Sequence, residues 1–259
     1  MKYTLVLNSG NNERPKLNSI QYDSFCNTEI MKQESSNTMP AVKTIDYLIP
    51  DVPQKLPFYD VPLLKATPES LKNYGELVDD YHDYPVEIVT WPPQGRRPVD
   101  AGTGNEAGTV SGTFEFWWQG DYLYGKNQAV NDQYLLGWSK NPGEAQKDPE
   151  NSGDHERVLL WHVNYHPDGG QLFYPLDGLP FVVPLALPGD DVKPSDFVAF
   201  YVDGGKGLYI HPNVWHEGVF PLTEKASFYD KQGKVHARIS CNIAQEFGVF
   251  LSVPLKYPS

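Results

Sequence analysis

Histidine and amide side chains recur every second residue in the stretch "RVLLWHVNYH", Arg157–His166. Successive side chains of an extended strand point to opposite faces, so His162, Asn164 and His166 would project from the same face. Histidine transfers protons near neutral pH, because its unperturbed pKa is about 6.5, and neutral imidazole also binds metals. The row is therefore either a set of proton carriers and ligands or a polar stripe that faces solvent.

A second pair of histidines stands in "GLYIHPNVWHEGVF", Gly207–Phe220, where His211 and His216 flank a Pro-Asn-Val-Trp turn. Between the two stretches, the turn "PDGG" leads from His166 to Gln171. Two neighbouring strands of a small barrel, with a third across it, can aim three or four side chains at one point inside. Imidazoles and a carboxylate at such a point bind a divalent metal, whereas neutral amides make the metal site weaker. The stretch at 207–220 is therefore interpreted as a pocket wall rather than a bare hairpin corner.

The spacing of these groups resembles the first cupin motif, in which a His-x-His pair precedes a Glu and then a Gly. Here His166 is followed after four residues by Gln171 and after six more by Gly178. The Pro-containing turn before His216 resembles the second motif of that fold. Asn164 stands where the motif has its first His, and Gln171 stands where it has Glu. The resemblance implies a cupin-type barrel, while the two amides argue against a tightly bound metal.

The block from His166 to Phe220 resembles the ureidoglycolate lyase family more specifically. The shared features are "HPDGGQLFYPLDGLPFVVPLALPGDD" and "FVAFYVDGGKGLYIHPNVWHEGVF". The segment "PESLKNYGELV" also resembles the opening of that family, where Tyr-Gly leads into the first strand. The resemblance covers somewhat more than half of the chain, leaves out residues 1–60 and is broken by insertions such as the polar loop Asn141–Glu156. It implies a lyase of purine nitrogen catabolism that cleaves ureidoglycolate into glyoxylate and urea.

Carried over to the matching positions, this resemblance gives His166, Gln171 and His216 as the catalytic candidates. The reaction requires a base at the carbinol hydroxyl and an acid at the departing urea nitrogen, and histidine suits both tasks near neutral pH. His166 and His216 would transfer protons or contact a metal, and Gln171 would orient the substrate. The same three residues are the candidate ligands of a divalent metal, Ni²⁺ or Mn²⁺, if one is bound.

Four further residues are candidates for binding a small-molecule carboxylate substrate: His162, Asn164, His211 and Arg238. Arg238 lies in "HARISCN" and would clamp the carboxylate if its strand face is interior; a surface salt bridge is the competing interpretation. His211 would border the pocket or be an ordinary structural histidine.

The sequence departs from the family pattern beside the predicted site. Glu217 stands where the family has a second His, and Tyr209-Ile210-His211 replaces Asn-Tyr-His. Two other hypotheses therefore stay open. One is a different cupin enzyme that acts on a small hydroxy or oxo acid, such as a metal-dependent isomerase, dioxygenase or sugar-acid enzyme. The other is a non-catalytic barrel that binds a small ligand.

Aromatic residues cluster in "FEFWWQGDYLYGK". Phe116, Trp118 and Tyr122 are interpreted as core residues. The alternative is an aromatic wall for a sugar-like ligand, with Glu115 as a nearby carboxylate.

The elements that must position these groups are mostly strands. From Tyr84 onward, short apolar or aromatic runs alternate with Gly, Pro and Asn, which is typical of an antiparallel β sandwich or barrel. The segment "ATPESLKNYGELVDDY" predicts a helix, with Thr67 as its cap and Pro68 in its first turn. The predicted fold is all-β, a cupin-like antiparallel barrel (jelly roll) with a few short helices. Residues 1–60 form an N-terminal extension, and 61–259 form the lyase-type domain.

Composition excludes several classes of protein. The 259 residues include 33 acidic and 21 basic ones, giving a net charge of −12. This negative charge disfavours nucleic acid and anionic membranes as partners. The two cysteines, Cys26 and Cys241, lack the spacing of a disulfide framework or zinc site. No apolar run matches a signal-peptide core or a membrane span. We therefore expect a cytoplasmic protein, and exposed barrel edges make a homodimer plausible.

Overall fold

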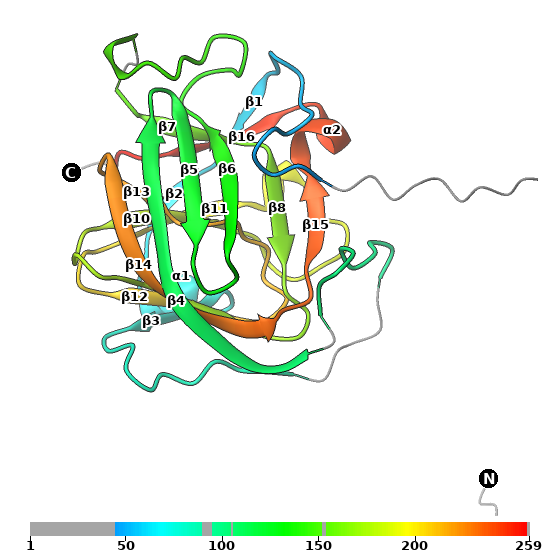
Figure 1. Cartoon of the computed structure of the whole chain (residues 1–259), viewed down its shortest axis with the longest axis vertical. Coiled ribbons are helices and arrows are strands. Elements are labelled where there is room, and N and C mark those ends of the chain that lie inside the picture. Colours follow the sequence, from blue (N-terminus) through cyan, green and yellow to red (C-terminus); the bar gives the residue numbers. More distant parts are fainter. Residues whose placement is uncertain (1–44, 90–94, 105, 152–153, 258–259) are drawn as a thin grey trace, which may run out of the picture. The chain divides into compact units, whose positions relative to one another are not determined.

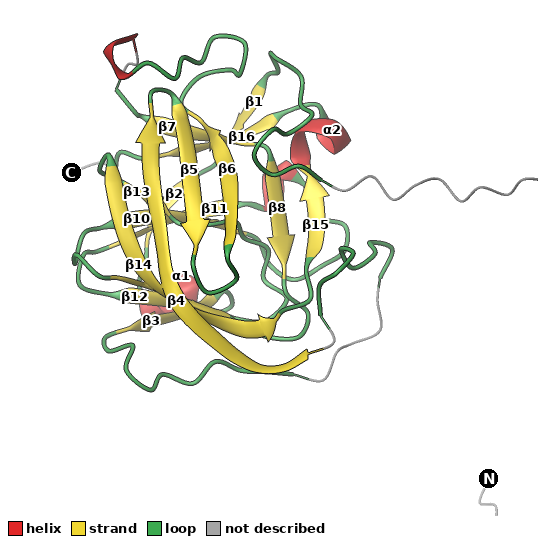
Figure 2. Cartoon of the chain, viewed as in Figure 1, coloured by secondary structure: helices red, strands yellow, loops and turns green. Residues whose placement is uncertain are grey.

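Strands dominate the computed structural model of the chain, which describes residues 45–89, 95–104, 106–151 and 154–257. These residues belong to one compact unit, Lys43–Ser259, and its helices are few and short (Figure 2). The predicted all-β class is confirmed. Most of the predicted extension, residues 1–44, lies outside the described residues, so its boundary with the domain at 61–259 stays a prediction.

The regular elements follow the alternation of short runs along the chain. The strands are β1 (Phe58–Asp60), β2 (Leu63–Lys65), β3 (Gly75–Val78), β4 (Glu106–Gln119), β5 (Tyr122–Asn127), β6 (Asp132–Trp138), β7 (Arg157–Leu160), β8 (His162–Tyr165), β9 (Gln171–Pro175), β10 (Phe181–Leu185), β11 (Val198–Val202), β12 (Gly207–Ile210), β13 (Phe220–Pro221), β14 (Lys225–Val235), β15 (Ile239–Asn242) and β16 (Phe250–Pro254). The helices are α1 (Pro68–Leu71) and α2 (Ile243–Phe247), with 3-10 turns at Pro149–Asn151 and Pro194–Asp196.

The described strands form three sheets. The largest has ten strands in the order β1-β16-β7-β6-β5-β4-β14-β9-β12-β3, a second has the order β13-β10-β11-β2, and β15 pairs with β8. Figure 1 shows β4, β5 and β6 as neighbouring long strands and the β8–β15 pair beside them. Among the described residues these ladders do not close into one barrel, so the jelly-roll assignment stays a prediction.

The stretch of aromatic residues on β4 and β5 packs inward. Phe116 is fully buried and Trp118 is nearly so, both in the main hydrophobic core, and Tyr122 packs partly buried against a second apolar cluster. Glu115 forms an ion pair with Lys225 at 3.4 Å instead of facing a ligand pocket. The core interpretation of this stretch is confirmed, and the aromatic wall for a sugar is not supported.

The predicted helix after Ala66 is shorter than the sequence pattern indicated. Thr67 caps it as predicted, because its side chain accepts a hydrogen bond of 3.1 Å from the Ser70 backbone N–H. The helix ends at Leu71, and Gly75 begins β3, which pairs with β12. A Cβ at Gly75 would lie 2.0 Å from the carbonyl oxygen of Tyr209, so only glycine allows this close approach. The helical prediction beyond Leu71 is therefore wrong, because sheet pairing outweighs the local pattern.

Replacing Thr67 by alanine should lower the free energy of unfolding by about 1 kcal/mol, since a lost N-cap costs roughly that amount. Urea denaturation of the purified chain measures the effect. Thr67→Ser keeps an equally good cap and should unfold like the parent chain; an equal loss in both variants would contradict the capping role.

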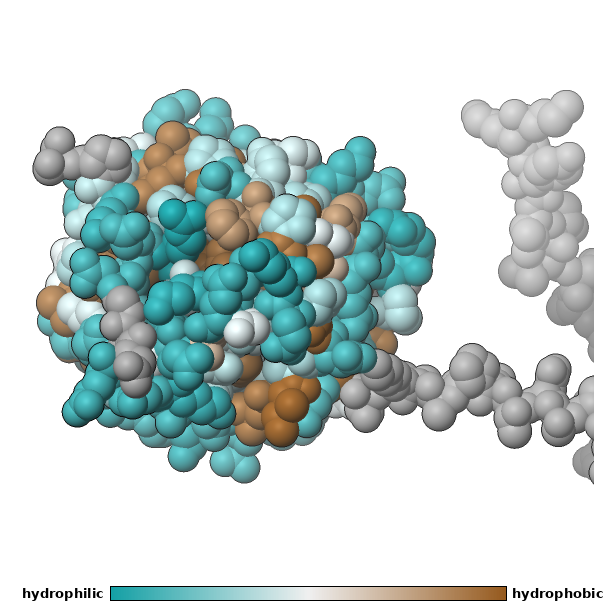
Figure 3. All heavy atoms as spheres, turned by 90° about the horizontal axis from the view of Figure 1, so that it is seen from above, coloured by the Kyte–Doolittle hydropathy of each residue, from teal (hydrophilic) through white to brown (hydrophobic). Residues whose placement is uncertain are grey.

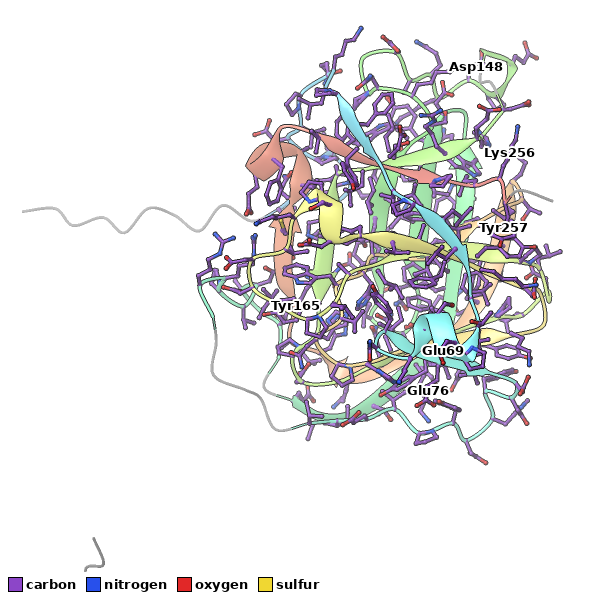
Figure 4. All side chains as sticks on the ribbon, turned by 180° about the vertical axis from the view of Figure 1, so that it is seen from behind. Glu69, Glu76, Asp148, Tyr165, Lys256 and Tyr257 are labelled. Carbon is purple, nitrogen blue, oxygen red and sulfur yellow. The ribbon has the colours of Figure 1, made fainter. Side chains whose placement is uncertain are left out.

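The described surface is mixed in polarity. Figure 3 shows a largely hydrophilic face with separate hydrophobic patches, and in Figure 4 the labelled Asp148 and Lys256 lie at the periphery of the fold. Among the described helices, none has the length and apolar character needed to cross a membrane. The surface gives no direct indication of a site, whereas the buried polar residues do.

Candidate functional site

Buried polar side chains from separate elements converge beside β8. β8 contributes His162 and Asn164, the turn after it His166, β9 Gln171, the turn after β12 His216, and β14 Asp230 and Gln232. Glu217, which follows His216, is partly buried. Strand alternation places His162 and Asn164 on one face, as the sequence predicted, and the structure buries that face. The backbones of Asn164 and His216 exchange two N–H···O hydrogen bonds of 2.8 Å each, which brings the late turn against β8.

These side chains, apart from that of Asp230, surround one cavity. The sequence-predicted site residues that line it are His162, Asn164, His166, Gln171, His216 and Arg238. Other polar residues that line it are Tyr47, Asn127, Tyr134, Glu217, Gln232 and His236. The space open to the centres of water molecules is about 40 Å³, whereas one water needs roughly 10–15 Å³. The cavity therefore suits a small polar molecule.

His211 is the one predicted site residue that the structure places elsewhere. Its side chain is partly exposed, and its Nε2 lies 3.7 Å from a carboxylate oxygen of Glu76 on β3. It does not line the cavity. Of the two histidines that flank the turn, only His216 forms part of the pocket wall.

His166 presents a lone pair to the cavity. Its Nδ1–H donates to the backbone carbonyl of Ala237 at 2.9 Å, which fixes the tautomer and leaves Nε2 unprotonated. Nε2 makes no hydrogen bond to the described residues. Burial, with His236 and His216 nearby, lowers the pKa of His166 well below 6.5. His166 is therefore a neutral base at physiological pH.

His216 is held from both sides of its ring. Nδ1 lies 2.8 Å from the carbonyl oxygen of Val214, and Nε2 lies 3.1 Å from Oε1 of Gln171. The Gln171 amide donates in turn to Asp230 Oδ1 at 2.7 Å, and Asn127 donates to Asp230 Oδ2 at 2.9 Å. Gln171 is thus part of a buried chain that ends on a carboxylate, and both of its amide atoms are engaged.

His162 and Asn164 share a carboxylate. Nδ1–H of His162 donates to Glu217 Oε2 at 2.7 Å, and Nδ2 of Asn164 donates to the same oxygen at 3.3 Å. Nε2 of His162 and Oδ1 of Asn164 are buried and have no partner, and the same holds for Nε2 of Gln232 and Nδ1 of His236. Buried polar atoms are nearly always paired, so four unpaired atoms around one cavity indicate groups that await a ligand.

Arg238 supplies positive charge to the cavity. Its Nε–H donates to Asp100 Oδ2 at 2.8 Å, and its terminal N–H groups make no hydrogen bond to the described residues. The guanidinium lies 4.5 Å from the ring centre of Tyr47, which is a cation–π contact. The interior interpretation of the Arg238 face is therefore supported, and its free N–H groups can bind a carboxylate.

Sequence reasoning missed Asp230 and Tyr47. Asp230 follows the inward alternation of β14, between Phe228 and Gln232, so a charge in an inward position was the available signal. Tyr47 lies in the segment predicted to be an extension, and its ring packs edge-on against His162 at 5.2 Å between centres. No local pattern marks it, because the contact joins residues far apart in the sequence.

The candidate metal ligands are two imidazoles and an amide, which bring no negative charge to a metal ion. Oε1 of Gln171 and Nε2 of His216 face one another, and Gln171 brings no charge. Within the described part of the chain, no group of three or more His, Cys, Asp or Glu is placed to hold a metal ion. These residues do not fit Ni²⁺ or Mn²⁺ in this arrangement. The metal assignment of His166, Gln171 and His216 stays a prediction, and we derive no step through a metal.

The segment that carries the cavity is similar to known proteins. Residues 151–243 match the family model of ureidoglycolate lyase. The resemblance to the ureidoglycolate lyase family seen in the sequence is thereby confirmed for this segment. It contains the histidines of the cavity, Gln171, Asp230 and Arg238, whereas Tyr47 and Asn127 lie outside it.

Curated ureidoglycolate lyases are similar to a segment of this chain. Ureidoglycolate lyase 2 of Rhizobium meliloti is 37% identical over 92 residues, which are 35% of this chain and 53% of the relative. The lyase of Azotobacter vinelandii is 38% identical over 63 residues, 24% of this chain and 38% of the relative. The lyase of Escherichia coli is 39% identical over 71 residues, which are 27% of this chain and 44% of the relative. The chain thus spans about half the length, or less, of these relatives.

Proposed function

We propose that this cavity cleaves ureidoglycolate into glyoxylate and urea. One observation carries the proposal: the same cavity holds a base with a free lone pair, Nε2 of His166, and a guanidinium with free N–H groups, that of Arg238. Both residues lie in the segment that matches the ureidoglycolate lyase family. Because that match covers part of the chain, the activity of the whole protein is a proposal.

His166 suits the first step of this reaction. Ureidoglycolate is a carbinolamide, so removal of its hydroxyl proton lets the C–N bond break as the aldehyde of glyoxylate forms. A positioned base contributes about 10²–10⁴-fold to such a proton transfer. The neutral Nε2 of His166 is ready to accept that proton, and its low pKa keeps it unprotonated.

The remaining polar groups of the cavity complement the substrate. Arg238 can bind the carboxylate through two N–H groups. The ureido group offers N–H donors and one carbonyl acceptor, which match the unpaired acceptors on His162 and Asn164 and the unpaired donor of Gln232. Such pairing would satisfy buried groups that are otherwise costly to leave without partners.

Tyr47 should affect substrate binding through Arg238. Replacing it by leucine removes the ring under the guanidinium, a contact worth about 1 kcal/mol, so KM for ureidoglycolate should rise about 5-fold with kcat nearly unchanged. Tyr47→Phe keeps the ring and should behave like the parent chain. Steady-state kinetics of both variants measure this, and an equal rise in KM for the phenylalanine variant would assign the effect to the hydroxyl instead.

The test of the proposed function is release of glyoxylate and urea from racemic ureidoglycolate by the full chain. The assay is run after chelation and again with added Ni²⁺ or Mn²⁺, which also tests the metal prediction. Stoichiometric glyoxylate and urea would support the lyase. Absence of both products at high protein concentration would reject it, and tight binding without turnover would then favour the ligand-binding barrel.

We also propose that the protein acts in the cytoplasm and as a homodimer. Acidic net charge supports solubility, and the end strands β1 and β3 of the largest sheet offer edges that a second copy could cover. Analytical ultracentrifugation of the full chain decides the oligomeric state.

A further inference from the structure

Arg238 is held by a short segment of the chain that lies outside residues 151–243, the part that matches the lyase family. Asp100 accepts the Nε–H of Arg238 at its Oδ2 atom, 2.8 Å away. The backbone N–H of Asp100 donates to the carbonyl oxygen of Arg238, also at 2.8 Å. Oγ1 of Thr103 accepts the backbone N–H of Arg238 at 3.0 Å. Both the backbone and the side chain of Arg238 are therefore fixed by this segment.

The Oδ2 atom of Asp100 has donors from three separate parts of the chain. Besides the Nε–H of Arg238, it accepts from the hydroxyl of Ser240 on β15 at 2.6 Å and from the hydroxyl of Tyr47 at 3.4 Å. The side chains of Asp100 and Arg238 are only 19% and 17% exposed, so little water competes for their contact. Hydrogen bonds between charged partners are also stronger than those between neutral ones. The carboxylate is thus a fixed point that orients the guanidinium.

These contacts leave one edge of the guanidinium to a ligand. A guanidinium can bind a carboxylate at its side, through Nε–H and one terminal N–H, or at its end, through the two terminal nitrogens. Asp100 occupies the Nε–H, and the guanidinium lies over the ring of Tyr47. The terminal nitrogens make no hydrogen bond to the described residues, and Arg238 lines the cavity. A ligand carboxylate therefore meets the end of the guanidinium.

We propose that Asp100 is a positioning residue that, by holding the Nε–H of Arg238, keeps the two terminal nitrogens aimed at the cavity as an end-on clamp for the carboxylate of the substrate. The part of this inference that concerns binding of ureidoglycolate rests on the proposed function; the orientation of Arg238 does not.

The charge of Asp100 and its geometry act in opposite directions on substrate binding. A carboxylate beside Arg238 repels the carboxylate of an incoming substrate, so its charge alone weakens binding. An arginine side chain without an anchor has many rotamers, and ordering such a side chain on binding lowers affinity by up to about 10-fold. Asp100 orders Arg238 in advance. The proposed role requires this geometric effect to exceed the repulsion.

Two replacements of Asp100 separate the two effects. Asp100→Leu removes both the acceptor and the charge at similar size. Its KM for ureidoglycolate should rise about 10-fold with kcat nearly unchanged, because Arg238 is no longer ordered before binding. Asp100→Asn keeps an oxygen that can accept the Nε–H and removes only the charge, so its KM should equal that of the parent chain or fall below it. A KM of Asp100→Leu at or below the parent value would overturn the inference, and so would an equal rise in both variants.

Glu246→Leu is the matched control for a merely structural role. Glu246 on α2 binds the guanidinium of Arg97, which is buried, through hydrogen bonds of 2.6 and 2.8 Å, and neither residue lines the cavity. Both leucine variants leave an arginine without its carboxylate and should unfold at a lower temperature than the parent chain. KM should rise in Asp100→Leu alone. An equal rise in folded Glu246→Leu would assign the effect to loss of structure and refute the positioning role.

The orientation of Arg238 is measured without substrate in ¹H–¹⁵N spectra of the full chain labelled with ¹⁵N-arginine. The Nε–H signal of Arg238 is assigned by its absence from the spectrum of Arg238→Gln. In the parent chain this proton should exchange with water more slowly than that of Arg157, whose side chain is 37% exposed. Asp100→Leu should lose the protection and Asp100→Asn should keep it. Equal exchange rates at Arg238 in the parent chain and in Asp100→Leu would overturn the inference.

Oxalurate tests the end-on clamp without turnover, because it has a ketone in place of the carbinol and so has no hydroxyl proton to lose. Its addition to the parent chain should slow the rotation of the terminal nitrogens of Arg238 and leave the protected Nε–H signal in place. Loss of that protection, or no response of the terminal nitrogens, would overturn the inference. Bound oxalurate without glyoxylate release from ureidoglycolate would reject the proposed function and leave the role of Asp100 standing. Glyoxylate release by Asp100→Leu with the KM of the parent chain would reject the role of Asp100 alone.

Discussion

Replacement of His166 by glutamine should lower kcat for glyoxylate release by about 10³-fold, within the range by which a positioned base accelerates proton transfer. Glutamine is of similar length and can still donate to the Ala237 carbonyl, so the cavity wall is retained. Its amide cannot accept the hydroxyl proton. KM should change little, because the Arg238 contact to the carboxylate is untouched. Initial rates over a range of ureidoglycolate concentrations measure both constants.

The pH profile gives an independent check of His166. A base is active only when it is unprotonated, and burial lowers the pKa of His166 well below 6.5. The acid limb of kcat/KM should therefore lie well below pH 6.5, with activity lost only as the pH falls through that lowered pKa. A limb at pH 6.5 or above would contradict the assignment of His166 as the base.

His82→Gln is the control for the glutamine substitution at His166. His82 is an exposed histidine paired with Asp80 and does not line the cavity. Its replacement should leave kcat and the unfolding transition unchanged. If the two variants lose activity equally, histidine chemistry in the cavity is not the cause.

Replacement of Arg238 by glutamine should raise KM for ureidoglycolate about 10²-fold. A hydrogen bond to a charged group contributes about 1.5–3 kcal/mol, and the loss of about 3 kcal/mol corresponds to roughly this factor. The variant removes the positive charge that binds the carboxylate and leaves Asp100 with Ser240 as a remaining partner at 2.6 Å. Steady-state kinetics with ureidoglycolate give the KM, and a KM unchanged from the parent chain would exclude Arg238 as the carboxylate anchor.

Two further variants sharpen the test of Arg238. Arg238→Lys keeps the charge without the two-pronged guanidinium and should lie between the parent chain and Arg238→Gln. Arg157→Gln removes a guanidinium that is partly exposed, near Asp60 and outside the cavity, and should not change KM. Thermal unfolding of each variant separates loss of binding from loss of structure.

Local sequence patterns determined those parts of this protein that depend on neighbouring residues. Strand alternation is a property of the backbone, so spacing alone predicted that His162, Asn164 and His166 share one face, whereas the burial of that face was not predictable from it. The cap at Thr67 involves residues three apart in the sequence, and it formed as predicted. The spacing from His166 through Gln171 to His216 also carried the resemblance to the ureidoglycolate lyase family, now confirmed for residues 151–243.

The tertiary structure decided everything that depends on which strands pair. The register of β14 against β9 places Asp230 next to Phe173, two residues beyond Gln171, and so turns the Gln171 amide toward a carboxylate that no spacing rule connects to it. Pairing of β12 with β3 places His211 against Glu76, outside the cavity, although it lies only five residues before His216.

The contact of Tyr47 with Arg238 is another one that sequence patterns could not predict, and it joins residues farther apart in the sequence. Tyr47 reaches Arg238 from a segment whose composition predicted only an extension. The local backbone conformation fixes which face of a strand a side chain occupies, and the two-residue alternation of the sequence reveals that face. What the side chain meets depends on sheet register and chain crossings over a hundred residues or more, which are set by the packing of the whole core rather than by any local pattern.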